Sequence, residues 1–411
     1  MRDKILQVCA RHLTPNGVAY VSYNTKPGWG AKGAIREMMQ HHARRFKTPR
    51  EQVQQARMLV DFFAQTASPA DGHFAKAVQA EAKILQNSGD AYIYHEHLSP
   101  INDCFFFHDF LAHAQSNNLR YLADMHFQTS TTSLLPTKVT DILRRMCPTE
   151  TEFEQYSDFV FGRTFRCSLL TRADAQFSGT LQPAALKQLH FYTAAQEEAA
   201  PDVTAGGDEK IFATPSGSRF STSNRLTQTS LQLLKQAAPR TIRFDELLTE
   251  SNAILGRRAS AVNPHAAAEE KAFLDGMMLA LTSNVAQAFL FAPSVGKRRS
   301  ANNPRTSALV RYQARINQPQ QPTQMETRWA SNALHGWVGI DDVSSFLLPL
   351  LDGTRSEAKL KQALADLMRN GTLPYMEDGK LLTDQKKIES IAKQTVELKL
   401  TEFEGQALLD D

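Results

Sequence analysis

Apolar residues recur at helical spacing along most of the first 175 residues, and short runs of β-branched and aromatic residues interrupt them. Residues 4–13 carry such an apolar face, which predicts a helix that stops at Asn16-Gly17. The run VAYVSY at 18–23 has little charge and predicts a strand buried in a parallel sheet. Apolar residues within 35–47 again recur on one helical face, which predicts a second helix.

The next segments alternate in the same way. Thr48-Pro49-Arg50-Glu51 combines a capping box with proline at the first helical position and predicts a helix start. Helical spacing resumes over 74–85, whereas the runs at 91–94, 120–123 and 164–170 are typical of strands. We therefore expect residues 1 to about 175 to form three strands with helices packed around them.

Changes in composition divide the rest of the chain. Residues 194–223 and 296–327 are rich in small and polar residues with few apolar anchors, which predicts two linkers. Between them, 224–295 reads as three helices and a short apolar segment, the order of a small winged-helix-like domain. Residues 328–411 predict a second small helical domain. The first domain then covers 1–193.

The overall composition changes this picture little. With 42% hydrophobic and 22% charged residues and no long apolar run, the chain is expected to be a soluble protein without a membrane span. The N-terminus resembles no secretory signal, so we expect a cytoplasmic location. The net charge of +3 is small, and the basic cluster at 297–299 with Arg305 reads as a solvated linker. Four scattered cysteines predict reduced thiols rather than disulfides: Cys9, Cys104, Cys147 and Cys167.

The segment GWGAKG at 28–33 matches the glycine pattern of dinucleotide-binding loops. Such a loop follows its strand directly and needs an acidic residue about 20 positions on. Here four residues separate the strand from Gly28, and Glu51 already caps a helix. We therefore interpret the match as accidental, in a loop that turns from sheet to helix.

Four ordered blocks carry a family resemblance: LTPNGVAYVSYNTKPGW with IREMM, YHEHLSPINDCFFFHDFLAHAQSNNLRYLADM, EQYSDFVFGRTFRCSLL and FLLPLLDGTRSEAKLKQAL. They resemble bacterial class I S-adenosylmethionine methyltransferases with a methyltransferase regulatory domain, a group that includes rickettsial-type protein-lysine methyltransferases. The resemblance implies that 18–23, 120–125 and 165–170 are the fifth, sixth and seventh strands of the methyltransferase sheet. Helical regulatory regions at about 47–90 and 129–160 are then insertions.

The implied fold class is α/β plus α, a partial Rossmann-like sheet with a helical insertion, followed by two winged-helix-like domains. In such enzymes a glycine-rich turn and an acidic residue hold S-adenosylmethionine, and both precede the helix at which this sequence starts. The family also usually has a larger residue, often His, at the position of Gly30. The resemblance thus implies the C-terminal part of a methyltransferase, without tight binding of the cofactor by this chain and without catalytic residues of its own.

Tyr23, Asn24 and Trp29 are the candidates to face substrate or cofactor, because open α/β sheets bind ligands at the carboxyl ends of their strands. The alternative is that Tyr23 and Trp29 pack in the core and Asn24 forms a turn.

A second group of candidates is rich in histidine. We expect His95, Glu96, Asn102 and His108 to form hydrogen bonds between domains. A metal site is the alternative, but the spacing fits no common metal motif, and histidines two residues apart on an extended segment would share a face.

The function expected is therefore recognition of a substrate or partner for methyl transfer, directed at protein lysine. Its partners would be a protein substrate or a separate N-terminal methyltransferase half, with self-association through an open sheet edge as a further option. The alternative is a non-enzymatic protein- or nucleic-acid-binding module that uses the winged-helix-like domains. Mixed charge in the last helices makes nucleic acid the weaker choice.

Overall fold

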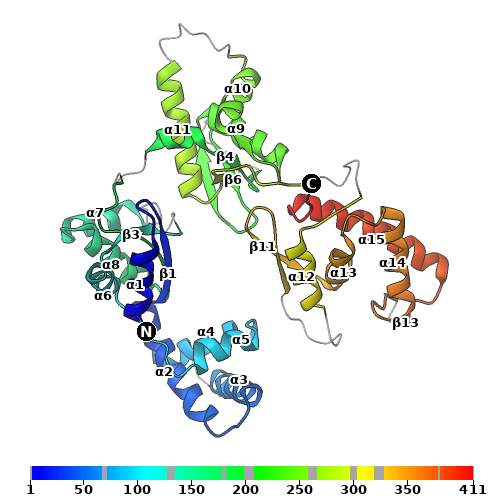
Figure 1. Cartoon of the computed structure of the whole chain (residues 1–411), viewed down its shortest axis with the longest axis horizontal. Coiled ribbons are helices and arrows are strands. Elements are labelled where there is room, and N and C mark those ends of the chain that lie inside the picture. The colour runs from blue at the N-terminus through cyan, green and yellow to red at the C-terminus, as the bar shows by residue number, and fades with distance from the viewer. Residues whose placement is uncertain are drawn as a thin grey trace. The chain divides into compact units, whose positions relative to one another are not determined.

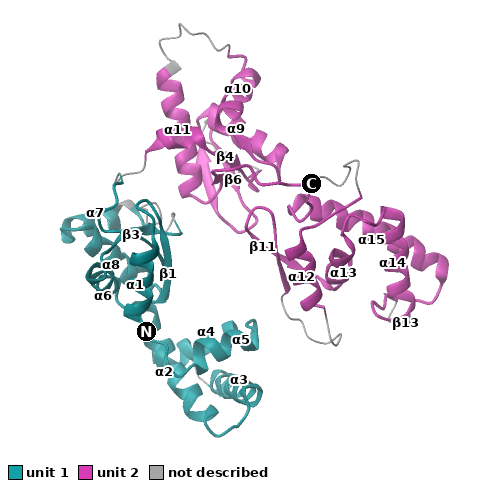
Figure 2. Ribbon diagram, in the orientation of Figure 1, with its two compact units in different colours: residues 1–181 teal, residues 182–411 magenta. Residues whose placement is uncertain are grey.

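The computed structural model describes residues 2–66, 72–126, 135–177, 182–198, 208–257, 266–296, 303–318, 328–377 and 380–410. The chain divides into two compact units, residues 1–181 and 182–411 (Figure 1, Figure 2). The basic cluster at 297–299 lies outside the described residues. In the part of the chain that is described, every helix is too short or too polar to cross a membrane.

A three-stranded sheet forms the centre of the first unit. It contains β1 (Ala19–Asn24), β2 (Leu119–Asp124) and β3 (Phe165–Arg172), in the order β1-β3-β2. The central strand β3 runs antiparallel to both neighbours, with Ala19 opposite Leu170. The prediction of a buried parallel strand at 18–23 is therefore wrong in its pairing, and Tyr20 is 53% exposed.

Two helices cover this sheet. Apolar side chains of α1 (Arg2–His12) and α6 (Phe107–Ser116) pack against β1 and β3 through Leu6, Phe110 and Leu170. Helices α7 (Thr137–Met146) and α8 (Glu150–Phe161) precede β3 (Figure 1). The Thr149 side chain accepts the Glu152 N–H, so α8 starts with the hydrogen bond expected of a helix cap.

A small helical bundle follows β1 in the chain. Its helices are α2 (Lys26–Ala43), α3 (Pro49–Thr66), α4 (Gly72–Gln86), α5 (Asp90–Ile93) and the π-helix η1 (Tyr94–Leu98). The capping box is present, since Glu51 N–H donates to Thr48 Oγ1.

The strand expected at residues 91–94 is absent from this bundle. Residues 90–98 form α5 and η1 instead, because helical turns bury Ile93 in the core of the bundle and bring His97 to Glu81 on α4.

The second unit begins with a mixed module. It comprises η4 (Pro183–Gln188), α9 (Arg225–Ala237), α10 (Phe244–Ile254) and α11 (Ala266–Thr282), with the sheet β8-β4-β9 (Ile242–Arg243, His190–Tyr192, Gln287–Phe289). A second sheet, β5-β6-β7 (Gln196–Glu198, Lys210–Ala213, Arg219–Thr222), occupies part of the segment 194–223. This segment differs from the predicted linker because Phe212 and Phe220 are buried and anchor it.

The C-terminal module is helical over 328–411, as its sequence predicts. The linker predicted at 296–327 is wrong in part, because α12 (Ala308–Ile316) lies within it and buries Val310 and Ala314 in the core of the module. Its other helices are α13 (Asp342–Leu347), η5 (Leu348–Leu350), α14 (Glu357–Arg369) and α15 (Gln385–Gly405). Two hairpins, β10-β11 (Arg328–Ser331, Trp337–Ile340) and β12-β13 (Met376–Glu377, Lys380–Leu381), complete it. Leu360, Leu364 and Leu400 lie in its core.

Gly296 joins the two modules of the second unit, because its N–H donates to the Leu409 carbonyl at 3.1 Å. A Cβ at this position would lie 2.2 Å from the backbone oxygen of Asp410. We expect Gly296→Ala to lower the free energy of unfolding by about 1–3 kcal/mol, measured by urea denaturation. Gly405→Ala, at a site with nothing within 4 Å of the new methyl group, is the control, and equal stability of the two variants would contradict this account.

Candidate functional site

A cavity with mainly apolar lining opens at the carboxyl end of β1 in the first unit and has a volume of about 520 Å³. It is formed by β1, α1, the π-helix η1 and the segment that precedes α6. Residues that line it include Arg2, Tyr23, Asn24, His95, Glu96, Asn102, Phe105 and Phe165. Side chains from sequence positions far apart therefore meet at one strand end.

Three polar side chains form a connected set on this cavity wall. Asn24 Nδ2 donates to Glu96 Oε2 at 3.2 Å and to Asn102 Oδ1 at 2.8 Å. Asn102 Nδ2 donates in turn to the Glu96 carbonyl at 2.9 Å and to Glu96 Oε2 at 3.3 Å. The Glu96 carboxylate is thus held by two amide groups, which fix its direction at the cavity. We call these three residues the polar triad.

Backbone hydrogen bonds bring the members of the polar triad together. Phe105 N–H donates to the Asn24 carbonyl and Lys26 N–H donates to the Phe105 carbonyl, both at 2.9 Å. These bonds hold the segment after Asn102 alongside the end of β1, with a parallel bridge between Thr25 and Phe105. Main-chain pairing of Phe105 with the end of β1 therefore places the Asn102 side chain next to Asn24.

Tyr23 lines the cavity but points mainly into the core. Its ring stacks on Phe110 with 3.9 Å between centroids, and its hydroxyl lies 3.1 Å from Ser168 Oγ. Burial raises the pKa of the Tyr23 hydroxyl far above its ordinary value. Tyr23 therefore stays protonated and supports the site by packing rather than as a base.

The π-helix that carries Glu96 is held by a hydrogen bond to the buried carboxylate of Glu81, which also forms an ion pair with Lys32. His97 is fully buried, and its Nε2 lies 2.7 Å from Glu81 Oε1 on α4. Lys32 Nζ on α2 lies 3.4 Å from the same oxygen. Single π-turns often occur at functional sites. In η1, the His97 side chain points towards α4 of the helical bundle, whereas Glu96 lines the cavity.

This ion pair predicts an acid-sensitive contribution to stability. Burial tends to raise the pKa of Glu81, but the hydrogen bond with His97 and the charge of Lys32 outweigh it and hold the pKa below its ordinary value. A lowered carboxyl pKa contributes stability that is present above the unfolded-state pKa and is lost as the pH falls through the folded-state pKa. We expect Glu81→Gln to cost about 1.5–3 kcal/mol at pH 7.

That difference in unfolding free energy should shrink as the pH falls below the ordinary value of 4.5. Urea unfolding of both proteins across pH 3–7 (on the order of the window in which carboxylates titrate) measures it. Parallel stability curves for the two proteins would contradict the role given to Glu81.

The structure brings together most of the residues singled out in the sequence. Tyr23, Asn24, His95, Glu96 and Asn102 all line the cavity. His95 is the most exposed of them, with 81% of its side chain accessible. Among the described residues, no three histidine, cysteine or acidic side chains are arranged to hold a metal ion.

Trp29 and His108 lie apart from this group. Trp29 is 5% exposed inside α2, where its ring faces the Lys32 ammonium at 4.8 Å. His108 Nδ1 lies 3.1 Å from Gln155 Oε1 on α8. In these contacts Trp29 acts as a packing aromatic and His108 as a link between α6 and α8.

The glycine segment 28–33 is helical, not a loop. It forms the first two turns of α2, and the N–H groups at its start are already used: Gly28 N–H donates to the Arg163 carbonyl at 2.9 Å, and Thr25 N–H donates to the Thr164 carbonyl at 3.0 Å. The loop expected here is therefore wrong. A helix N-terminus binds phosphate through free N–H groups, and these two are capped by carbonyl oxygens.

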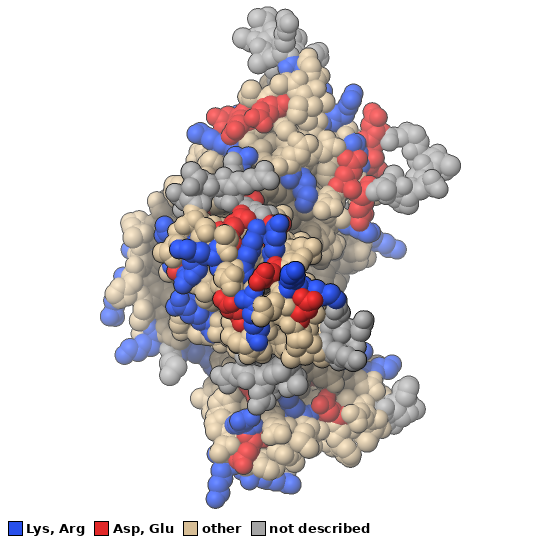
Figure 3. Space-filling model, turned by 90° about the vertical axis from the view of Figure 1, so that its right-hand side faces the viewer, with Lys and Arg blue, Asp and Glu red and all other residues tan. Residues whose placement is uncertain are grey.

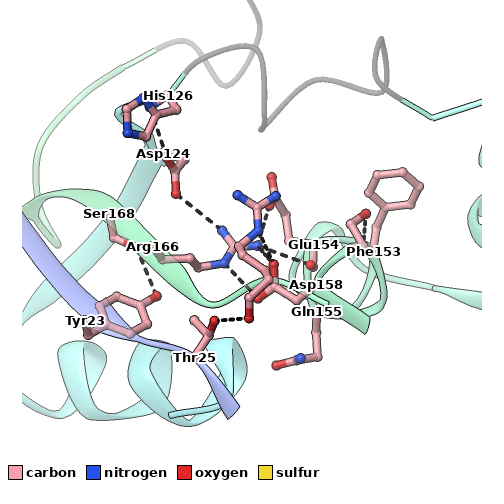
Figure 4. A network of polar contacts seen from close by, with 12 residues as sticks. Tyr23, Thr25, Asp124, His126, Phe153, Glu154, Gln155, Asp158, Arg166 and Ser168 are labelled. Atoms are coloured by element: carbon pink, nitrogen blue, oxygen red, sulfur yellow. Dashed lines mark hydrogen bonds and ion pairs between the residues drawn. The ribbon is translucent and has the colours of Figure 1, made fainter. Parts of the chain in front are cut away.

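Sequence reasoning missed a buried charged network beside the cavity (Figure 4). Arg166 on β3 is 1% exposed and donates from Nε and Nη2 to the two carboxylate oxygens of Asp158, at 2.9 and 2.8 Å. Its Nη2 also donates to Glu154 Oε2 at 2.8 Å, and Asp124 Oδ2 lies 3.8 Å from Nη1. The sequence does hold a signal for this network: an arginine interrupts a strand-like run, and two acidic residues lie four positions apart on the preceding helix.

Two family descriptions match the chain. Residues 89–172 match the predicted methyltransferase regulatory domain, and residues 302–408 match the PKMT C-terminal winged helix domain. Among curated proteins of Rickettsia prowazekii, RP789 is 26% identical over 417 residues, which cover all of this chain and 72% of RP789. RP028 is 38% identical over 122 residues, which cover 30% of this chain and 49% of RP028.

Solved structures of PKMT2 from Rickettsia typhi have a similar fold. The match to PKMT2 has a TM-score of 0.80 at 26% identity and covers 99% of this chain and 77% of PKMT2. The complex of PKMT2 with AdoHcy matches with the same TM-score at 27% identity and covers 78% of that chain. The chain is therefore similar to PKMT2 over nearly all of its length, and it contains segments that match a methyltransferase regulatory domain and a PKMT winged helix domain.

Proposed function

We propose that this chain supplies the regulatory and acceptor-facing part of an S-adenosylmethionine-dependent methyltransferase, with a protein lysine as acceptor. The observation that carries the proposal is the polar triad at an open cavity. The similarity to PKMT2, solved in complex with AdoHcy, supports the same class of chemistry.

The polar triad has the chemistry to orient an acceptor. Methyl transfer is an in-line displacement, and its rate depends on holding donor and acceptor in position. The Glu96 carboxylate can accept a hydrogen bond from a neutral acceptor amine, whose nitrogen lone pair stays free to attack the methyl group. Asn24 and Asn102 keep that carboxylate in one orientation.

The described residues fit the methyl donor only in part. The cavity has the size of a small-molecule site, and Glu96 offers an acidic group, but the start of α2 uses its N–H groups on carbonyl oxygens. We therefore propose that a separate segment supplies the donor pocket, and that residues 1–411 by themselves bind S-adenosylmethionine weakly and transfer no methyl group. S-Adenosylmethionine would supply the methyl group once that segment is in place.

The surface around β1 supports a partner on this side of the sheet. Within the described residues, β1 pairs with a strand along one edge only, and its other edge is paired only at its end, where the Asn24 carbonyl accepts the Phe105 N–H. Val18 and Tyr20 beside this edge, and Ile5 and Val8 on α1, are each about half exposed, between 49% and 53%. An unpaired strand edge flanked by apolar side chains favours association. The partner that we propose is an N-terminal methyltransferase segment, and a second copy of the chain is the alternative.

Capture on a resin tests this proposal. The immobilised chain should retain the portion of PKMT2 that lies outside the matched region, and Tyr20→Lys should weaken that retention by about tenfold or more because it places a charge at the contact. Phe62→Lys, at a residue on α3 that is 59% exposed, is the matched control. No retention of the PKMT2 portion, or an equal loss of retention with Phe62→Lys, would contradict the proposal. If the immobilised chain retained free copies of the same chain instead, the second copy would be the favoured partner.

The nucleic-acid alternative has weaker support. Figure 3 shows acidic side chains among the lysines and arginines on the face that it presents, whereas nucleic-acid surfaces concentrate basic side chains. A gel shift on duplex DNA that falls steeply with salt would favour the alternative.

A further inference from the structure

An exposed aromatic cluster lies beside the candidate site, on the loop before α6 and on α8. Phe106 lies 5.9 Å from Phe159 between ring centroids, and Phe159 lies 5.9 Å from Tyr156 in an edge-to-face contact. The His108 ring stacks on Phe106 at 5.5 Å. Tyr156 and Phe159 are 40% and 49% exposed, so both side chains are partly open to solvent.

The aromatic cluster is connected to the cavity through two neighbouring residues. Phe105 lines the cavity, whereas Phe106 belongs to the cluster. The main chain between them is fixed, because Phe105 exchanges backbone hydrogen bonds with Asn24 and Lys26 at 2.9 Å. Phe106 has an extended backbone, so its side chain points away from that of Phe105, and a ligand that contacts both sites has to cross this segment.

The aromatic cluster already accepts a cation from the chain itself. The Lys26 ammonium lies 4.7 Å from the centroid of Phe106, within the range in which a ring face attracts a positive charge. The Lys26 ammonium already contacts the Phe106 ring, so a second cation would bind to the rings of Tyr156 and Phe159.

Helix α8 also favours positive charge at this place. Tyr156 and Phe159 lie in its last two turns, where the carbonyl ends of a helix carry partial negative charge. The last turn of α8 holds no lysine or arginine, and the Arg163 that follows is turned back to Asp158, with Nε 2.6 Å from Oδ1.

We propose that the aromatic cluster binds a lysine or arginine side chain of a protein acceptor, next to the acceptor residue that enters the cavity. The inference rests on the proposed function for its acceptor, but its recognition chemistry is independent of the methyl donor. A partner that contacted the cluster only through apolar groups would gain nothing from a positive charge. The effect of removing the charge therefore distinguishes cation–π binding from apolar contact.

Binding of a defined peptide to the full chain tests the proposal. The probes are a fluorescent twelve-residue peptide of alternating glycine and lysine, and the same peptide with norleucine in place of lysine, followed by fluorescence anisotropy. We expect the lysine peptide to bind more tightly than the norleucine peptide. The double substitution Tyr156→Leu and Phe159→Leu should weaken lysine-peptide binding by about fivefold, as loss of an exposed cation–π contact of about 1 kcal/mol implies.

The matched control is Phe62→Leu with Phe63→Leu, another exposed aromatic pair in the same unit, with ring centroids 5.5 Å apart. Unchanged binding by this control, with a loss in the cluster variant, supports the proposal. Equal binding of both peptides, equal loss in both variants, or no effect of the cluster substitutions would overturn it. Because no methyl donor is present, these outcomes are separate from any failure of AdoHcy binding.

Discussion

Replacing Arg166 with methionine is expected to lower the free energy of unfolding by about 3 kcal/mol, because Glu154 loses its buried counter-charge and Asp158 keeps only that of Arg163. Asp158 is fully buried, and its two carboxylate oxygens accept hydrogen bonds from Arg166 at 2.8 and 2.9 Å. Methionine fills a similar volume, so the loss reports the charge rather than a cavity. The guanidinium also lies 3.9 Å from the Phe107 ring, and this contact is lost too.

Hydrogen–deuterium exchange read at β3 and α8 measures this effect within the first unit. Arg172→Met is the control, because Arg172 lies on the same strand and donates two hydrogen bonds to Asp174, at 2.9 and 2.8 Å, yet is 38% exposed. We expect little change from this exposed pair. Similar protection in the two variants would show that the buried network does not hold α8 to the sheet.

Gly28→Ala is expected to destabilise the first unit by about 1–3 kcal/mol or more. A Cβ at Gly28 would lie 2.4 Å from the Gly162 carbonyl oxygen and 2.8 Å from the Arg163 carbonyl carbon, both of them backbone atoms. The start of α2 must therefore move away from the segment after α8. Hydrogen–deuterium exchange read at α2 and α8 measures the change.

Gly30→Ala provides the control within the same helix. No atom lies within 4 Å of a Cβ at Gly30, so alanine should stabilise the helix by about 0.5–1 kcal/mol. Opposite signs at these two positions are expected if the glycines serve helix packing. A loss of stability at Gly30 as large as that at Gly28 would contradict this explanation of the glycine pattern.

The sequence predicts the strands of the first unit well, because the runs at 18–23, 120–123 and 164–170 have high β-propensity and turn residues at their ends. The run at 91–94 has similar propensity but forms helix, because burial of Ile93 and His97 against the bundle overrides it. The three strands in 194–223 were missed because each is only three or four residues long. Local patterns cannot reveal pairing between such short segments.

The candidate site was predicted as two separate groups of residues. Asn24 follows from its place at a strand end, and Glu96 and Asn102 follow from a polar run, but their contact spans 72 and 78 positions and depends on the pairing of Phe105 with β1. Trp29 could not be placed from its pattern, since aromatic residues at helical spacing serve both core and site. Arg166 was missed because arginine seldom occurs fully buried.

The most direct test of the central claim is a calorimetric titration of AdoHcy into the chain, with and without the portion of PKMT2 outside the matched region. The account predicts no micromolar binding to residues 1–411 by themselves. We expect binding with a Kd in the micromolar range, about 8 kcal/mol, when both are present. Micromolar binding of AdoHcy to the chain by itself would contradict the proposal that a separate segment supplies the donor pocket.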